Sequence, residues 1–339
     1  MRDRYNREIT YLRLSVTDLC NLRCRYCMPA EGVCKLRHED MLTEDEMILA
    51  VEAAASLGIR KVRVTGGEPL VKKNILSICR RIAAVQGIGE VCLTTNGILL
   101  PAFASDLRDV GVNRLNISLD TLNPKKYTSM TRGGKLQDAL NGIEAALQAE
   151  FEKIKINTVL IGGFNDDEIR ELAELTLQWP VDVRFIELMP MPGQEEFSAK
   201  AFVPDARVME LLPELQISEH GKMLHDGTVV RGMNEENRKM EITDGVARIW
   251  QLPGAQGNVG LISPVFHSFC EKCSRIRLTA DGKIKPCLHS SEEYPVKGLD
   301  AEQMKQQFVR AINGKPACHD GLSFAERSHS RRSMHAIGG

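Results

Sequence analysis

Residues 11–29 read YLRLSVTDLCNLRCRYCMP and combine a strand-like run, 11–16, with three closely spaced cysteines. The cysteines follow the pattern Cys-x3-Cys-x2-Cys and are Cys20, Cys24 and Cys27. Three thiolates this close on one loop can bind three irons of a 4Fe-4S cluster and leave the fourth iron without a protein ligand. A structural zinc site is the alternative, but zinc normally takes four ligands, and the nearest histidine, His38, stands eleven residues past Cys27.

Around this motif, short β-like runs alternate with longer amphipathic stretches up to about residue 188. Thr43 and Glu46 predict a capping box at the start of the first helix, and Gly58 follows its end. Six βα units in series predict a parallel sheet, either doubly wound or an incomplete barrel. The expected strands are 11–16, 61–65, 91–95, 114–118, 155–160 and 182–187, and the expected helices are 43–57, 74–85, 101–110, 135–149 and 166–178.

The alternation of side chains within these strands favours the barrel. The strands of a doubly wound sheet are covered by helices on both faces, so they read as nearly continuous apolar runs. Here one face of most strands is polar and basic, as expected of a lumen open to a ligand. We therefore predict an α/β fold, an incomplete (β/α)6 TIM-like barrel. The polar-face residues are Arg13 and Ser15; Lys61, Arg63 and Thr65; Asn116 and Ser118; and Lys155 and Asn157.

The overall composition excludes several classes of protein. The 339 residues carry a formal net charge of -1, whereas nonspecific nucleic-acid binders usually have a basic excess. An anionic substrate must therefore meet a local cluster of positive charge. No apolar run approaches the roughly eighteen residues of a membrane helix, and the opening MRDRYNREIT lacks the apolar core of a secretory signal. We expect a cytoplasmic enzyme that binds neither nucleic acid nor membranes.

A second cysteine group lies in a less regular C-terminal part, which begins after the break at 189–193. Cys270, Cys273 and Cys287 again supply three thiolates and suit a cluster with an open iron. His267 or His289 could instead complete a zinc site, and spacing alone leaves both readings open. This part also contains β-like runs at 228–232, 246–252 and 260–265 and a helix candidate at 301–312. The other four cysteines, Cys34, Cys79, Cys92 and Cys318, are scattered.

The first triplet, with Tyr26 between its last two cysteines, resembles the signature of radical S-adenosylmethionine (SAM) enzymes. The resemblance extends to residues 65–69, Thr-Gly-Gly-Glu-Pro, at the end of the second strand. It implies that the open iron chelates SAM and that the reduced cluster cleaves SAM to methionine and a 5'-deoxyadenosyl radical. The positions that match SAM contacts in this family are Tyr26, Gly67, Ser118 and Met189.

The barrel, the second triplet, the arginines that follow it and the Gly-Gly terminus together resemble the GTP 3',8-cyclase family. The resemblance runs from about residue 9 to 339. It implies a lyase with two 4Fe-4S clusters that removes hydrogen from C3' of GTP and joins C3' to C8. The product would be (8S)-3',8-cyclo-7,8-dihydroguanosine 5'-triphosphate, in the first step of molybdenum cofactor biosynthesis.

In that family the second cluster's open iron holds guanine, and cationic side chains hold the triphosphate and ribose. Guanidinium groups suit this task because they donate two parallel hydrogen bonds to phosphate oxygens. The resemblance also gives the terminal glycines a role in catalysis; without it, a disordered basic tail would be expected. The matching GTP positions are Arg13, Arg63, Thr94, Lys155, Arg275, Ile276 and Arg277, and the catalytic set is Arg275, Arg277, Gly338 and Gly339.

The same resemblance predicts the organisation and the partners. We expect a partial barrel over 5–190, a C-terminal domain with the second cluster over 191–326, and a basic tail over 327–339. The expected partners are a reductant such as flavodoxin or ferredoxin, a second copy in a homodimer, and cyclic pyranopterin monophosphate synthase. Lys72, Lys73, His335 and Ala336 depart from the family pattern. The alternatives are another radical SAM enzyme with an auxiliary cluster, such as a peptide-modifying enzyme, and a non-enzymatic electron carrier or zinc-stabilised binding protein.

Overall fold

The computed structural model describes residues 1–33, 36–192, 194, 196–217, 222–223, 229–230, 246–265, 268–319, 322 and 328–338. Its centre is a run of six parallel strands that pair in sequence order. All six correspond to the strands predicted from sequence, with ends shifted by at most two residues. They are β1 (Tyr11–Ser15), β2 (Lys61–Thr65), β3 (Glu90–Thr95), β4 (Arg114–Ser118), β5 (Lys153–Leu160) and β6 (Val181–Glu187).

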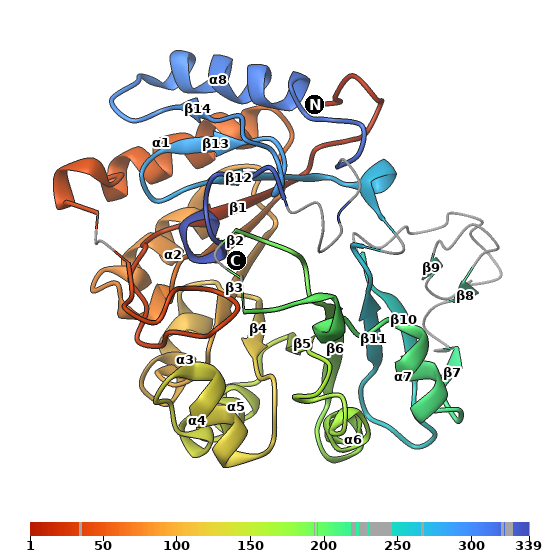
Figure 1. Cartoon of the computed structure of the whole chain (residues 1–339). Coiled ribbons are helices and arrows are strands. Elements are labelled where there is room, and N and C mark those ends of the chain that lie inside the picture. Colours follow the sequence, from red (N-terminus) through yellow and green to blue (C-terminus); the bar gives the residue numbers. More distant parts are fainter. Residues whose placement is uncertain are drawn as a thin grey trace, which may run out of the picture.

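Helices connect these strands and cover the outer face of the curved sheet (Figure 1). The capping box is present: Thr43 Oγ1 accepts from the Glu46 amide at 3.2 Å, and Glu46 Oε2 accepts from the Thr43 amide at 2.8 Å. The fourth connection contains an extra helix, α4, that was not predicted. The connecting helices are α1 (Glu44–Ser56), α2 (Ile75–Ala84), α3 (Leu100–Asp109), α4 (Pro124–Thr131), α5 (Leu136–Gln148) and α6 (Ile169–Gln178).

The hydrophobic core lies between the sheet and these helices. Leu12, Leu14, Val62 and Val64 point outward from β1 and β2 and are fully buried. Each such side chain contributes about 1.5–3 kcal/mol when removed from water. Because neighbouring residues on a strand face opposite sides, burying this apolar set turns Arg13 and Arg63 toward the inside of the barrel.

The C-terminal part adds strands to both edges of the six-strand sheet. At one edge, β11 (Val259–Ile262) runs parallel to β6. At the other, β12 (Arg275–Leu278) runs parallel to β1 and was not predicted. The described residues thus form a twelve-stranded sheet in the order β14-β13-β12-β1-β2-β3-β4-β5-β6-β11-β10-β7. Its remaining strands are β7 (Gln216–Ile217), β10 (Arg248–Gln251), β13 (Lys283–Lys285) and β14 (Tyr294–Pro295).

Two further helices lie in this C-terminal part, α7 (Ala206–Leu211) and α8 (Ala301–Asn313), and α8 confirms the helix expected there. The runs expected at 246–252 and 260–265 correspond to β10 and β11. Of the run at 228–232, only β9 (Val229–Val230), paired with β8 (Lys222–Met223), lies within the described residues. Among the helices of the described ranges, none is long and apolar enough to cross a membrane.

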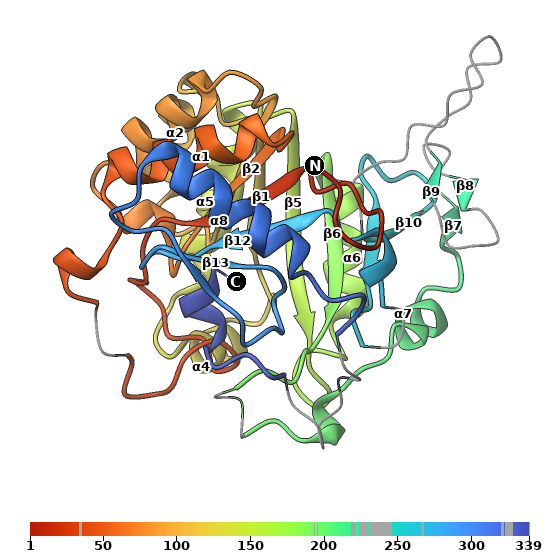
Figure 2. The same cartoon turned by 90° about the horizontal axis from the view of Figure 1, so that it is seen from above.

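The sheet curves around an interior space, and the chain returns into it at its C-terminal end (Figures 1 and 2). The last short helix, η5 (Met334–Ile337), lies beside β1 and β2. A freely disordered tail, the expectation without the family resemblance, is therefore wrong for residues 328–338.

Candidate active site

A cavity of about 760 Å³ fills the space inside the curved sheet. This volume is typical of sites for drug-sized or cofactor-sized ligands. The cysteines of both triplets line it, although the triplets are separated by more than two hundred residues in sequence. The predicted site residues on its wall are Arg13, Tyr26, Arg63, Gly67, Thr94, Ser118, Lys155, Met189, Arg275 and Arg277.

Three predicted site residues are not among those that line the cavity: Ile276, Gly338, whose contacts are given below, and Gly339. Ile276 is 1% exposed and its side chain packs in the apolar core, because β12 turns it to the face opposite Arg275 and Arg277. Its side chain therefore faces away from the cavity, and the predicted contact of Ile276 with GTP would be made by its backbone. Gly339 lies outside the described residues.

Gly67 brings the end of β2 into direct contact with the first cysteine loop. Its amide donates to the Thr17 carbonyl at 2.8 Å, and the Glu68 amide donates to the Leu19 carbonyl at 2.7 Å. A Cβ at Gly67 would lie 2.3 Å from the Leu19 carbonyl oxygen. Glycine is required here because no larger residue permits this approach.

Glu68 ties the loops around the first triplet together. Its buried carboxylate accepts from the amides of Leu70 and Asn96, at 3.0 and 2.7 Å, and from Thr95 Oγ1 at 2.8 Å. Burial raises its pKa to about 7. The Asn96 side chain in turn donates to Asn21, the neighbour of Cys20, at 2.7 Å. Glu68 belongs to the Thr-Gly-Gly-Glu-Pro motif at residues 65–69, but the sequence predicted no function for it.

The three cysteines of the first triplet are free and half-buried. Burial raises the pKa of Cys20 to about 11 and that of Cys27 to about 12. Nearby, the Tyr26 hydroxyl donates to Asp120 at 2.8 Å, and burial raises the pKa of Asp120 to about 6. Three soft donors beside a ligand-sized cavity fit an iron-sulfur cluster, whose positive irons would stabilise their thiolate forms.

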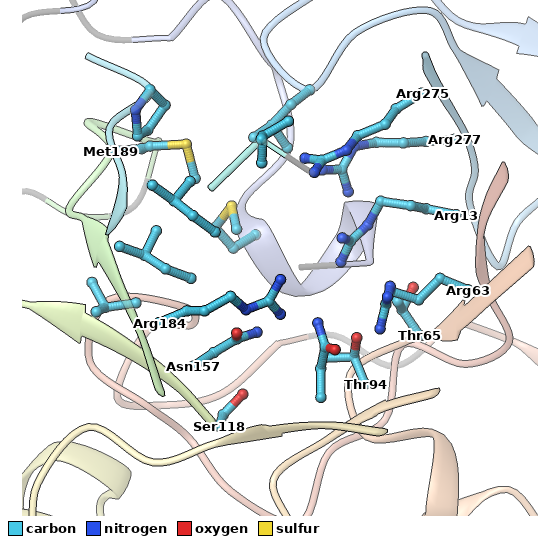
Figure 3. A pocket seen from close by; sticks show the side chains of 18 of the residues that line it. Arg13, Arg63, Thr65, Thr94, Ser118, Asn157, Arg184, Met189, Arg275 and Arg277 are labelled. Carbon is cyan, nitrogen blue, oxygen red and sulfur yellow. The ribbon is translucent and has the colours of Figure 1, made fainter. Parts of the chain in front are cut away.

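Arginines from strands that are distant in sequence project into one space (Figure 3). In the sheet register, Arg13 pairs with Arg63 on one side and with Arg277 on the other. Arg184 projects from β6 on the opposite side of the cavity (Figure 3). The alternation of side chains along the strands predicted that Arg13, Arg63 and Lys155 point into the barrel. All three line the cavity.

Much of this positive charge is not neutralised by neighbouring carboxylates. Arg63 Nε donates to the Tyr11 hydroxyl, while its Nη1 and the Nε of Arg184 have no hydrogen-bond partner in the described part of the chain. The nearby carboxylates Glu90 and Asp182 pair with Lys61 and Lys153, at 2.9 and 2.8 Å. The cavity is therefore suited to an anion carrying several charges.

The second triplet lies at the β12 side of the cavity, with Cys270 in the short helix η4 (Cys270–Lys272). His289 Nδ1 hydrogen-bonds Ser328 Oγ at 3.0 Å, and its ring meets that of His319 edge to face. His267 lies outside the described residues. Within the described ranges, no three His, Cys, Asp or Glu side chains converge on a point that could hold a single metal ion. A cluster does not require such convergence, because each cysteine binds a different iron.

The C-terminal tail also reaches this cavity. The Gly338 carbonyl accepts from Arg277 Nη1 at 2.8 Å and from Arg13 Nη2 at 3.3 Å. Gly338 has φ +68°, and a Cβ there would lie 2.4 Å from Thr65 Oγ1. Glycine is therefore needed for both its conformation and its close contact with β2.

Sequence reasoning missed several residues of the cavity wall. Tyr11 is central among them: burial opposes its ionisation, but Arg63, Arg13 and Arg275 outweigh burial and lower its pKa to about 8. Applying the same alternation of side chains to the sixth strand would have identified Arg184 as an inward-facing residue. Lys315 carried no local signal, because it stands in the irregular segment after α8.

Comparisons with known proteins agree with this geometry. The Radical SAM superfamily profile matches residues 14–176, and the Molybdenum Cofactor Synthesis C profile matches residues 181–321. Over its full length the chain is 43% identical to the whole GTP 3',8-cyclase of Alkaliphilus oremlandii (strain OhILAs). Over 99% of its length it is 44% identical to the GTP 3',8-cyclase of Peptoclostridium acidaminophilum, covering 98% of that protein.

Among solved structures, Streptococcus suis SuiB bound to its precursor peptide SuiA matches with a TM-score of 0.57 at 15% identity. The match covers 83% of this chain and 60% of SuiB, so it supports the fold alone. The full-length identity to the cyclases is far higher. The chain therefore belongs to the GTP 3',8-cyclase family, and its barrel is a radical SAM domain.

Proposed function

We propose that this enzyme is a lyase that converts GTP to (8S)-3',8-cyclo-7,8-dihydroguanosine 5'-triphosphate, the first step of molybdenum cofactor biosynthesis. The observation that carries the proposal is that both cysteine triplets and an excess of cationic side chains line one cavity. A triphosphate nucleotide is an anion of the size and charge that such a cavity accommodates.

Cys20, Cys24 and Cys27 hold the first 4Fe-4S cluster, and Tyr26, Gly67, Ser118 and Met189 contact SAM. When bound, this cluster and SAM supply the carbon radical that abstracts hydrogen. The protein's own task is to orient the substrate and exclude water. The rigid contacts of Gly67 and Glu68 with the cysteine loop support this assignment, since they fix the loop against β2.

Cys270, Cys273 and Cys287 hold a second 4Fe-4S cluster on the far side of the substrate. The free thiols at the cavity wall support this assignment. If bound there, such a cluster would offer its open iron to the guanine base. Arg275 and Arg277 follow directly on β12 and contact the nucleotide.

Arg13, Arg63, Lys155 and Arg184 bind the triphosphate, and Thr94 contacts the nucleotide. Unsatisfied hydrogen-bonding atoms in the cavity support this assignment. Arg63 Nη1, Arg184 Nε and Thr94 Oγ1 are buried and lack hydrogen-bond partners among the described residues. Buried polar atoms of this kind are costly unless a ligand satisfies them. Gly338 and Gly339 complete the site from the tail and act in catalysis.

The same proposal assigns a domain organisation of 5–190, 191–326 and 327–339, which the matches to 14–176 and 181–321 support. The reaction consumes electrons, so a reductant such as flavodoxin or ferredoxin is required. We also propose a homodimer and contact with cyclic pyranopterin monophosphate synthase, which would receive the product.

The test uses anaerobic, reconstituted full-length protein with dithionite and SAM. We expect about eight irons per chain and 5'-deoxyadenosine formation that depends on GTP. ATP is the matched control nucleotide, since it has the same triphosphate. Equal 5'-deoxyadenosine formation with ATP, or zinc near one per chain with little iron, would contradict the proposal.

A further inference from the structure

Lys315 is a buried ammonium beneath the second cysteine triplet. The residue is 3% exposed and follows α8 in the segment Gly314-Lys315-Pro316. Its Nζ atom donates to the Arg275 carbonyl at 2.8 Å and to the Pro286 carbonyl at 2.9 Å. Arg275 stands two residues after Cys273 and Pro286 directly precedes Cys287, and Lys315 lines the same cavity as both cysteines. One side chain thus connects the segment after Cys273 with the segment before Cys287.

Among the residues that the structure describes, no carboxylate pairs with Lys315. Within the described ranges the ammonium makes no ion pair with an aspartate or glutamate, and its oxygen partners are two neutral carbonyls. A buried charge is costly unless an opposite charge compensates for it. The anionic groups expected beside its two carbonyl partners are Cys273 and Cys287, which line the same cavity and would be thiolates as cluster ligands. A 4Fe-4S core with three thiolates has a net negative charge, so the cluster would supply the missing counter-charge.

Arg7 provides an instructive contrast at the same site. Its Nη1 atom donates to the Cys270 carbonyl at 2.7 Å, so it also supports a segment of the second triplet. However, Arg7 is neutralised by Asp3, whose carboxylate lies 2.6 Å from the Arg7 Nε. Of these two supporting cations, only Lys315 lacks a carboxylate partner among the described residues.

We propose that Lys315 is a positioning residue for the second cluster, which it also makes easier to reduce. The inference rests on the proposed function only in requiring that the second triplet holds a cluster. A positive charge near an anionic cluster stabilises the reduced form, which carries one more electron. At an effective dielectric constant of about 20, one charge a few ångströms away changes such an equilibrium by about tenfold or more.

The test isolates the second cluster in the full-length chain by replacing Cys20, Cys24 and Cys27 with alanine. This parent is reconstituted anaerobically, its iron is counted, and its midpoint potential is measured by EPR-monitored titration without GTP. We expect about four irons. Lys315→Met and Lys315→Gln should each disfavour reduction by about tenfold, or about 59 mV for one electron. Lys315→Arg keeps the charge and should remain within about threefold of the parent.

Lys285→Met is the matched control. Lys285 is a fully buried lysine of the same C-terminal part, but it pairs with Glu293 at 3.5 Å and does not line the cavity. Its replacement should leave the potential unchanged. If the Met and Gln variants lose iron while the Arg variant retains it, the positioning role is supported.

Two results would overturn the inference. One is that the parent binds four irons but the Lys315→Met and Lys315→Gln variants have the same midpoint potential as the parent. The other is an Arg variant that is as impaired as the Met variant, since the charge would then be irrelevant. A parent that takes zinc in place of iron contradicts the second cluster itself, and this outcome is recognised before any Lys315 variant is measured.

Discussion

Arg277 Nη1 lies 2.8 Å from the carbonyl oxygen of Gly338, so an arginine of the cavity wall holds the C-terminal tail. Arg13, on the neighbouring strand, donates to the same oxygen at 3.3 Å. Two arginines that we propose contact the nucleotide therefore share a hydrogen-bond network with the tail that we propose acts in catalysis. Substrate binding and tail position should depend on each other, because each arginine divides its donors between the two.

Gly338→Ala should reduce kcat by about tenfold or more. A positive φ costs a non-glycine residue about 1–3 kcal/mol, and the added Cβ would collide with Thr65. The measurement is the rate of product formation, with the iron content of each protein determined in parallel. Gly254→Ala is the matched control, because Gly254 has φ +78° but no atom within 4 Å of the added Cβ. Equal rates in the two variants would contradict a role for the tail contact.

Arg332 does not line the cavity, but it should hold the C-terminal tail in position. Its guanidinium forms paired hydrogen bonds with Asp281, both at 2.9 Å, and with Glu293, at 2.5 and 2.7 Å. Gly338 lies six residues after Arg332. We expect Arg332→Met to lower kcat roughly tenfold with intact clusters, because half-buried bidentate pairs with Asp281 and Glu293 are lost.

A surface ion pair provides the control for this change. Arg207 pairs with Glu210 at 3.0 Å on an exposed helix, where such contacts contribute little. Arg207→Met should leave kcat unchanged. An Arg332→Met enzyme as active as this control would show that the tail docks without the clamp.

Arg184→Met should raise the KM for GTP by about tenfold or more, since hydrogen bonds to charged groups contribute about 1.5–3 kcal/mol. The KM for SAM should change little, because Arg184 is assigned to the triphosphate. Steady-state kinetics with each substrate varied in turn separates the two. A rise confined to the KM for SAM would place Arg184 at the other ligand.

Lys155 should give the GTP affinity a pH dependence. Burial, reinforced by Arg184, lowers the pKa of Lys155 to about 7. As the pH rises from 7 to 8.5 the ammonium loses its proton, while the phosphates, with a last pKa of about 6, are already ionised. The KM for GTP should therefore increase over this range. Lys155→Arg should flatten the profile because its guanidinium stays charged; an equally steep profile in both enzymes would exclude Lys155 as the cause.

Local sequence patterns predicted the six barrel strands, their inward residues and both cysteine groups. These features follow from side-chain alternation and spacing along one stretch of chain. By contrast, β12 escaped prediction because its four residues become a strand only by pairing with β1, more than two hundred and fifty residues away in sequence. The support from Arg332 and Lys315 was missed for the same reason. Their partners, Asp281, Glu293 and the carbonyls beside the second triplet, are brought to them by the tertiary fold alone.

The proposal that this enzyme removes hydrogen from C3' of GTP is tested by following that hydrogen atom. The full-length enzyme is incubated anaerobically with SAM, dithionite and GTP deuterated at C3', and the 5'-deoxyadenosine is examined by mass spectrometry. We expect one deuterium in the 5'-deoxyadenosine and the loss of one deuterium from the cyclised nucleotide. Unlabelled 5'-deoxyadenosine formed at the full rate would contradict it, because hydrogen would then come from a source other than C3' of GTP.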